Sequence, residues 1–177
     1  LLIERNVVSA SEVREYLDFM DSRGEHVGAE IIAKAWTNPD FKKQLMTDGT
    51  ATVAGMGVPM AGAELIVVEN TDDVHNLIVC TLCSCYPRTI LGLPPDWYKS
   101  KVYRSRAVHE PRAVLREFGT ILADHVSVRV HDSNADMRYL VMPKRPAGTE
   151  GWNILQLAEL VTRDSMIGIA GAQQPPV

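Results

Sequence analysis

The chain has 177 residues, 46% of them hydrophobic and 23% charged, and a formal net charge of −4 at pH 7. This length fits one domain with a sizeable core, and the scattered basic residues predict no nucleic-acid partner. No apolar run approaches the roughly 20 residues of a membrane span, and no secretory leader pattern is present. We therefore expect a cytoplasmic protein without membrane contact.

The first third of the chain is predicted to be helical. Ser11 can cap a helix with apolar residues at helical spacing, and a second helix is expected at about 29–36. A third helix should begin with Asn38 as its cap and Pro39 at its first position, where proline fits well. It should continue to the glycine-rich segment 55–57.

The rest of the chain mixes strands and helices. Residues 64–69 and 74–79 are predicted as strands, as are residues 126–130 and 137–142, which we expect to pair with each other. The prolines at 87, 94 and 95 predict an irregular stretch that is not helical. Two further helices are expected, at 111–118 and 153–162.

All three cysteines of the chain lie within six residues, at Cys80, Cys83 and Cys85. We call this segment, residues 80–85, the claw. The C-x-x-C spacing lets two thiolates converge, whereas Cys83 and Cys85 are too close in sequence for an unstrained disulfide. The pattern therefore favours a metal site over a disulfide framework.

Two other readings of the cysteines are weaker. A structural zinc site wants four protein ligands, and no fourth cysteine or paired histidine lies nearby. A thioredoxin-like exchange motif lacks its strand-to-helix context, and it would leave the third thiol without a role. The remaining interpretation is a metal that keeps an open position and acts as a Lewis acid.

The segment from Val74 through the claw to Pro95 resembles the α subunit of nitrile hydratases and of the related thiocyanate hydrolases. The likeness extends in family order from about Gly28 to about Gly168. It includes the segments Trp97–Ser100, Tyr103–Arg106, Glu110–Arg112, Met137–Tyr139, Arg145–Trp152 and Arg163–Gly168.

The resemblance implies an α+β fold, in which N-terminal helices precede a layered α-β-β-α body that binds the metal. We expect one nitrile hydratase α-subunit-like domain over residues 1–177. Residues 1–27 would form a helical arm, residues 28–168 the metal-binding catalytic body, and residues 169–177 a loose tail.

The resemblance also implies a trivalent metal ion held by five atoms of the claw. The ligands would be the sulfurs of Cys80, Cys83 and Cys85 and the backbone nitrogens of Ser84 and Cys85. Cys80 would remain an unmodified thiolate, whereas Cys83 would be a sulfinate and Cys85 a sulfenate. Oxygenation withdraws charge from sulfur and so tunes the acidity of the metal.

Two neighbours of the cysteines bear on the metal. Thr81 and Tyr86 resemble the cobalt-type pattern, so we expect Co(III), with Fe(III) as the alternative. The implied reaction is hydration of a nitrile to its amide, with Cys83, Ser84 and Cys85 in the catalytic centre. The nucleophile stays open among hydroxide activated by the metal, the sulfenate oxygen and a nearby water.

The resemblance implies partners as well. A β subunit, in one chain or split into two, would supply arginines to the oxidised cysteines, because buried negative oxygens need cationic partners. A metal-insertion activator protein and a small nitrile are the other expected partners.

Five residues outside the claw match family positions that surround the metal or the pocket. Arg138 matches an arginine that supports the claw, Asp136 lies beside it, and His75 matches a family histidine. Arg88 replaces a common tryptophan and Ala61 a common glutamine, which predicts a larger or more polar pocket. An ordinary strand-edge role for Arg138, a structural role for His75 and a solvent-facing Arg88 are the alternatives.

Other functions remain open from the sequence. The chain could be the metal-binding subunit of a thiocyanate hydrolase, since that family shares the claw. It could also be a non-catalytic thiolate module for metal binding or insertion, with plain thiols. A zinc-stabilised interaction domain would instead lose its fold on chelation.

Overall fold

The computed structural model describes residues 3–5, 7–21 and 23–176, without the side chains of residues 19–21. Residues 1–2, 6 and 22 of the predicted arm and residue 177 of the predicted tail lie outside that description. The fold is α+β, as predicted. Its helices are α1 Ala10–Asp21, α2 Glu25–Thr37, α3 Pro39–Thr47, α4 Gly49–Ala54, α5 Arg88–Leu91, α6 Asp96–Lys99, α7 Lys101–His109, α8 Pro111–Glu117, α9 Ile154–Ala158 and α10 Arg163–Ile167.

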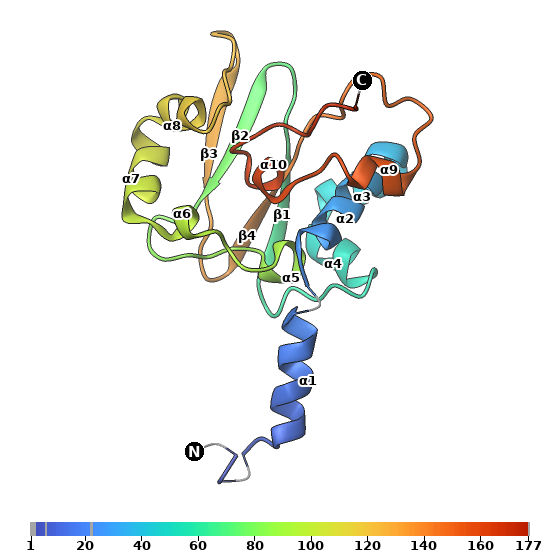
Figure 1. The fold of residues 1–177 in the computed structure, drawn as a ribbon, viewed down its shortest axis with the longest axis vertical. Coiled ribbons are helices and arrows are strands. Elements are labelled where there is room, and N and C mark those ends of the chain that lie inside the picture. The colour runs from blue at the N-terminus through green and yellow to red at the C-terminus, as the bar shows by residue number, and fades with distance from the viewer. Residues whose placement is uncertain (1–2, 6, 22, 177) are drawn as a thin grey trace.

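Four strands form two parallel pairs in the middle of the body (Figure 1). β1, Glu64–Glu69, pairs with β4, Met137–Met142. β2, Val74–Val79, pairs with β3, Ser127–Asp132. Helices α2, α3, α4 and α9 lie on one side of the strands and α6, α7 and α8 on the other, while α1 extends away from the body.

The predicted pairing of 126–130 with 137–142 is wrong. Each of these strands pairs instead with a strand more than 50 residues upstream, and both pairings are parallel. The apolar alternation that identifies a strand fixes which face it buries, but it does not choose the neighbouring strand. The register that results places Val79, the last residue of β2, beside Asp132, the last residue of β3.

The prediction of an irregular, non-helical stretch after the claw is also wrong in part. Pro87 and Pro95 occupy the positions just before α5 and α6, so they begin short helices. Ser100 then caps α7, because its hydroxyl accepts a hydrogen bond from the Tyr103 amide at 3.1 Å. Proline is unfavourable inside a helix but compatible with its start.

The helix caps refine the other predictions. Asn38 caps α3 with Pro39 next to it, as predicted. The helix does not run to residue 55, because the Asp48 carboxylate accepts from the Ala51 amide and begins α4. At the first helix Ser9, not Ser11, bonds the Glu12 amide, which makes Ser9 the cap.

The last predicted helix, 153–162, is likewise divided. α9 ends at Ala158, and the Thr162 hydroxyl accepts from the Ser165 amide to begin α10. Among the described residues, no helix is both long and apolar enough to cross a membrane.

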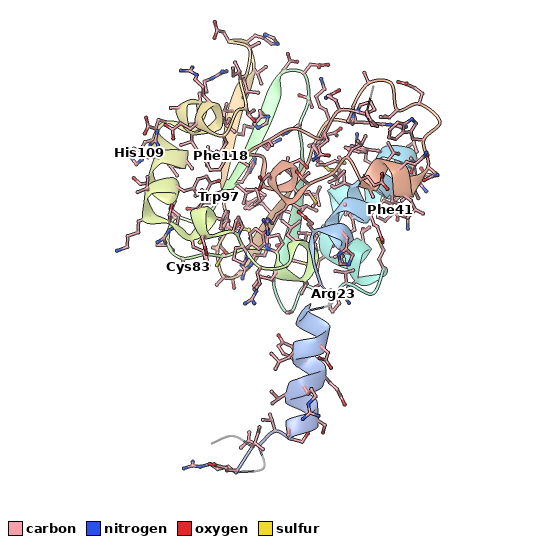
Figure 2. The ribbon with its side chains drawn as sticks, in the orientation of Figure 1. Arg23, Phe41, Cys83, Trp97, His109 and Phe118 are labelled. Carbon is pink, nitrogen blue, oxygen red and sulfur yellow. The ribbon has the colours of Figure 1, made fainter. Side chains whose placement is uncertain are left out.

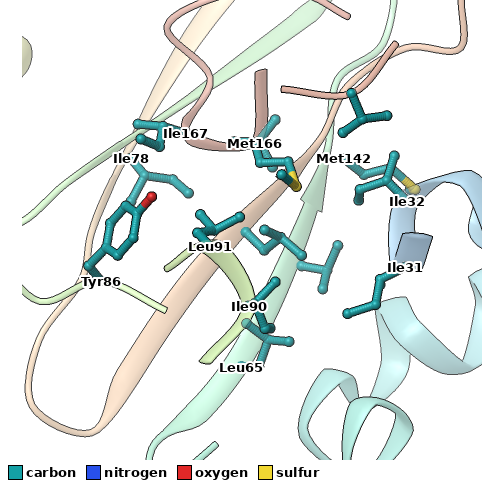
Figure 3. Close-up of a cluster of buried hydrophobic side chains, with 14 of the residues drawn as sticks. Ile31, Ile32, Leu65, Ile78, Tyr86, Ile90, Leu91, Met142, Met166 and Ile167 are labelled. Atoms are coloured by element: carbon teal, nitrogen blue, oxygen red, sulfur yellow. The ribbon is translucent and has the colours of Figure 1, made fainter. Parts of the chain in front are cut away.

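The core fills the space between the strands and the helices that cover them. Figure 3 shows Ile31 and Ile32 of α2 on one side and Ile78 of β2 on the other, with residues of α5 and α10 between them. The close packing requires Gly28 in α2, since a Cβ there would lie 2.5 Å from the Met166 sulfur. The last five residues of β2 are all buried, so this strand is a firm base for the segment that follows it.

Candidate metal centre

The claw begins where β2 ends, and its three sulfurs converge. The Sγ atoms of Cys80 and Cys83 are 3.3 Å apart, and those of Cys83 and Cys85 are 3.1 Å apart. All three thiols are free, and their sulfurs lie within 4.8 Å of one another. Three clustered thiols suit a transition metal that binds thiolates, so the residues present fit a metal site.

The cysteines differ in exposure. Cys80 is fully buried behind the end of β2, Cys85 is half-buried and Cys83 is exposed. The Cys83 amide donates to the Cys80 sulfur at 3.2 Å, which tightens the turn between them. One side of the claw is therefore anchored in the core, and the other faces outward.

Residues from three other elements hold the backbone of the claw. Asp132 of β3 accepts two hydrogen bonds from Thr81, one from its amide at 2.9 Å and one from its hydroxyl at 2.6 Å. Arg104 of α7 donates to the Cys83 carbonyl at 3.0 Å. The Tyr98 hydroxyl of α6 donates to the Cys85 carbonyl at 2.8 Å. Figure 2 shows Cys83 close to the part of the molecule that carries Trp97 of α6.

The surroundings of Cys83 and Cys85 shift the pKa values of these two thiols in opposite directions. Hydrogen bonds from Cys85 and then Cys80 lower the pKa of Cys83 to about 7. Burial raises the pKa of Cys85 to about 12, and the positive charge of Arg138 partly opposes this rise. At neutral pH the exposed Cys83 is therefore the more readily ionised of these two.

The chain is similar to known proteins over nearly its whole length. The sequence profile of the family described as "Nitrile hydratase, alpha chain" matches residues 1–170. The chain belongs to the nitrile hydratase α-chain family. The low-molecular-weight cobalt-containing nitrile hydratase subunit alpha of Rhodococcus rhodochrous is 48% identical, over 99% of this chain and 86% of that protein. This is a family of enzyme subunits.

Solved structures give the same family placement. A recombinant thiocyanate hydrolase with partially modified cobalt centres superposes with a TM-score of 0.91 at 41% identity, covering 99% of this chain and 90% of that one. A mutant Fe-type nitrile hydratase from Comamonas testosteroni Ni1 gives 0.90 at 42% identity, covering 98% and 86%. The nitrile hydratase α-chain fold therefore occurs in relatives with either metal and with either activity.

The residues predicted to surround the claw lie at different places in the structure. Arg138 lies on β4, half-buried, and its charge acts on Cys85. Asp136 lies in the exposed turn before β4, where its carbonyl accepts from the Glu64 amide at 2.7 Å. The Arg138 side chain donates to the carbonyl of its neighbour Met137 at 3.2 Å, so it acts on Cys85 through its charge, and Asp136 precedes it by two residues.

The described contacts of His75 are away from the claw. It lies near the start of β2, and its Nε2 bonds the Gly168 carbonyl at 2.7 Å. Burial lowers the pKa of His75. This contact ties β2 to the end of α10.

Arg88 and Ala61 line two separate hollows on the surface. Arg88 contributes to one of about 670 Å³, which Arg23 and Arg163 also line. Ala61, with a φ of 50°, contributes to one of about 940 Å³ that runs along β1. Neither hollow is lined by a cysteine of the claw.

Three residues that hold the claw were not predicted from the sequence. Asp132 could have been found only with the correct pairing of β2 and β3, which sets it beside Val79. Tyr98 and Arg104 lie in segments that resemble the family, but nothing in the pattern indicates that they bond the claw.

Proposed function

We propose that this chain binds a trivalent cobalt ion in its claw and that the assembled enzyme hydrates a nitrile to the corresponding amide. The observation that carries the proposal is the convergence of three free sulfurs within 4.8 Å at the end of a buried strand. The backbone nitrogens of Ser84 and Cys85 would complete the protein ligands. When bound, such an ion supplies Lewis acidity toward a nitrile or a water.

The exposure of the three thiols supports the proposed degree of oxygenation at each. Oxidation follows thiolate character and access. Cys83 is exposed, in keeping with a sulfinate. Cys85 is half-buried, in keeping with a sulfenate, and the fully buried Cys80 would stay a thiolate.

The oxygenated sulfurs need positive partners, since unpaired charge in a dry pocket is costly. We propose that Arg138 is one of them for Cys85, with Asp136 beside it, because the charge of Arg138 already acts on that thiol. The exposed side of Cys83 is left for arginines of a β subunit, in one chain or split into two. A metal-insertion activator would load the claw in the cytoplasm, where thiols stay reduced.

Cobalt is preferred to iron on two grounds. Thr81, between Cys80 and Cys83, and Tyr86, after Cys85, resemble the cobalt-type pattern, and the Rhodococcus rhodochrous relative is cobalt-containing. Metal analysis of the chain purified from cells supplied with both ions would decide between them.

A second candidate is thiocyanate hydrolysis. It is favoured by the close superposition with a solved thiocyanate hydrolase. Arg88 and Ala61 also depart from the pattern of simple aliphatic nitrile hydratases. The test is turnover of small nitriles, bulky heteroaromatic nitriles and thiocyanate, with and without partner chains. Amide formation from a nitrile supports the first proposal, and consumption of thiocyanate alone would replace it with the second.

A further inference from the structure

Arg104 reaches from α7 to the claw. With Thr81 and Leu82 it lines a hollow of about 450 Å³ between the claw and that helix. Its Nη1 donates to the Cys83 carbonyl at 3.0 Å and lies 3.5 Å from the Thr81 carbonyl. The guanidinium thus bonds the backbone of the claw rather than its sulfurs.

The charge of Arg104 has no acidic partner among the residues that the structure describes. Its Nε is buried and makes no hydrogen bond there. Arg106, two residues further along α7, differs because it forms ion pairs with Glu110 and Glu117. A half-buried guanidinium without a carboxylate is costly unless negative charge comes close to it.

The claw itself depends on such polar bonds. Its residues Thr81 to Ser84 are exposed, so burial does not fix their conformation. The carbonyl that Arg104 holds belongs to the peptide group joining Cys83 to Ser84. A peptide group is planar and its N–H points away from its C=O. Fixing that oxygen toward α7 therefore also fixes the direction of the Ser84 nitrogen.

We propose that Arg104 is a positioning residue of the metal centre. It orients the peptide group between Cys83 and Ser84, and its positive charge balances the thiolates gathered around the ion. The inference rests on the proposed function, because it assumes that sulfur and the Ser84 nitrogen face a metal. Partners outside the ligands typically matter by orienting the ligands.

The test is titration of the full metal-free chain with Co²⁺ under anaerobic, reducing conditions, followed by the sulfur-to-cobalt absorption band. Loss of such an outer partner typically costs about tenfold to a hundredfold in metal affinity, and we expect this for Arg104→Gln. The band at saturation should also change in shape or intensity, which a purely structural role would not cause. Arg104→Lys keeps the positive charge but loses the planar set of N–H donors. Its affinity for Co²⁺ should therefore lie between those of the wild-type chain and Arg104→Gln.

Arg106→Gln is the matched control, since it removes a guanidinium from the same helix that does not touch the claw. It should bind Co²⁺ like the wild-type chain. Wild-type affinity and spectrum in a folded Arg104→Gln chain would overturn the role of Arg104. If circular dichroism shows that Arg104→Gln is unfolded, a wild-type affinity for Co²⁺ in Arg104→Lys would overturn the role of Arg104. Absence of the band in the wild-type chain would overturn the proposed function as well.

Discussion

Asp132 offers the most direct way to perturb the claw without touching a ligand. Its carboxylate accepts from both the amide and the hydroxyl of Thr81, at 2.9 and 2.6 Å. Replacing it in Asp132→Ala removes both bonds at the junction between β2 and the claw. The metal-free claw should then sample other conformations, and the ion must select the competent one.

The size of the effect follows from these two bonds. A hydrogen bond to a charged group contributes about 1.5–3 kcal/mol, and the exposure of Asp132 and replacement by water reduce the total. We expect a loss of about 2 kcal/mol, which is roughly a 30-fold weaker affinity for Co²⁺. Asp132→Asn keeps an acceptor without the charge and should lose about half of that free energy.

The assay is the Co²⁺ titration, with urea unfolding of the metal-free chain as the measure of global stability. Because the claw is exposed, the free energy of unfolding should change less than the free energy of Co²⁺ binding. A double-mutant cycle with Thr81→Val isolates the hydroxyl bond, and we expect a coupling of about 1 kcal/mol. Wild-type affinity in Asp132→Ala, or zero coupling in the cycle, would refute this reasoning.

Three further predictions concern the fold and the support of the claw. In Gly168→Ala the new Cβ would lie 1.9 Å from the Asn76 carbonyl oxygen at a φ of 87°. We expect a loss of more than about 3 kcal/mol in urea unfolding, and an unchanged midpoint would contradict this. Burial lowers the pKa of His75 below its ordinary 6.5, so its neutral form is favoured in the folded state. The stabilisation by neutral His75 should be complete above about pH 6.5 and should decrease as the pH falls below that value. In His75→Asn, the free energy of unfolding should therefore depend less on pH between about pH 7 and about pH 5. Tyr98→Phe removes the hydroxyl bond to the Cys85 carbonyl and should weaken Co²⁺ binding by about 1 kcal/mol, whereas wild-type binding would show that this bond does not orient the claw.

The sequence predicts the metal centre better than its surroundings. The three cysteines and the strand before them are local features, and the structure brings their sulfurs together as expected. Residues 64–69, 74–79 and 137–142 are strands with the predicted bounds. Each of these strands contains buried apolar residues, which give it a recognisable pattern.

The long-range contacts were not predictable in the same way. Asp132 reaches Thr81 only because β3 pairs with β2, and alternation in a single strand carries no record of its partner. α7 was missed because its segment has few apolar residues at helical spacing. Arg104 therefore lies on a helix that the sequence does not signal, and its bond to the claw is visible only in the structure.

The most direct test of the central claim is metal analysis of the purified chain together with mass spectrometry of the peptide that contains the claw. We expect cobalt, with two added oxygen atoms on Cys83, one on Cys85 and none on Cys80. Zinc with three unmodified thiols, or an active enzyme whose claw carries no transition metal, would contradict it.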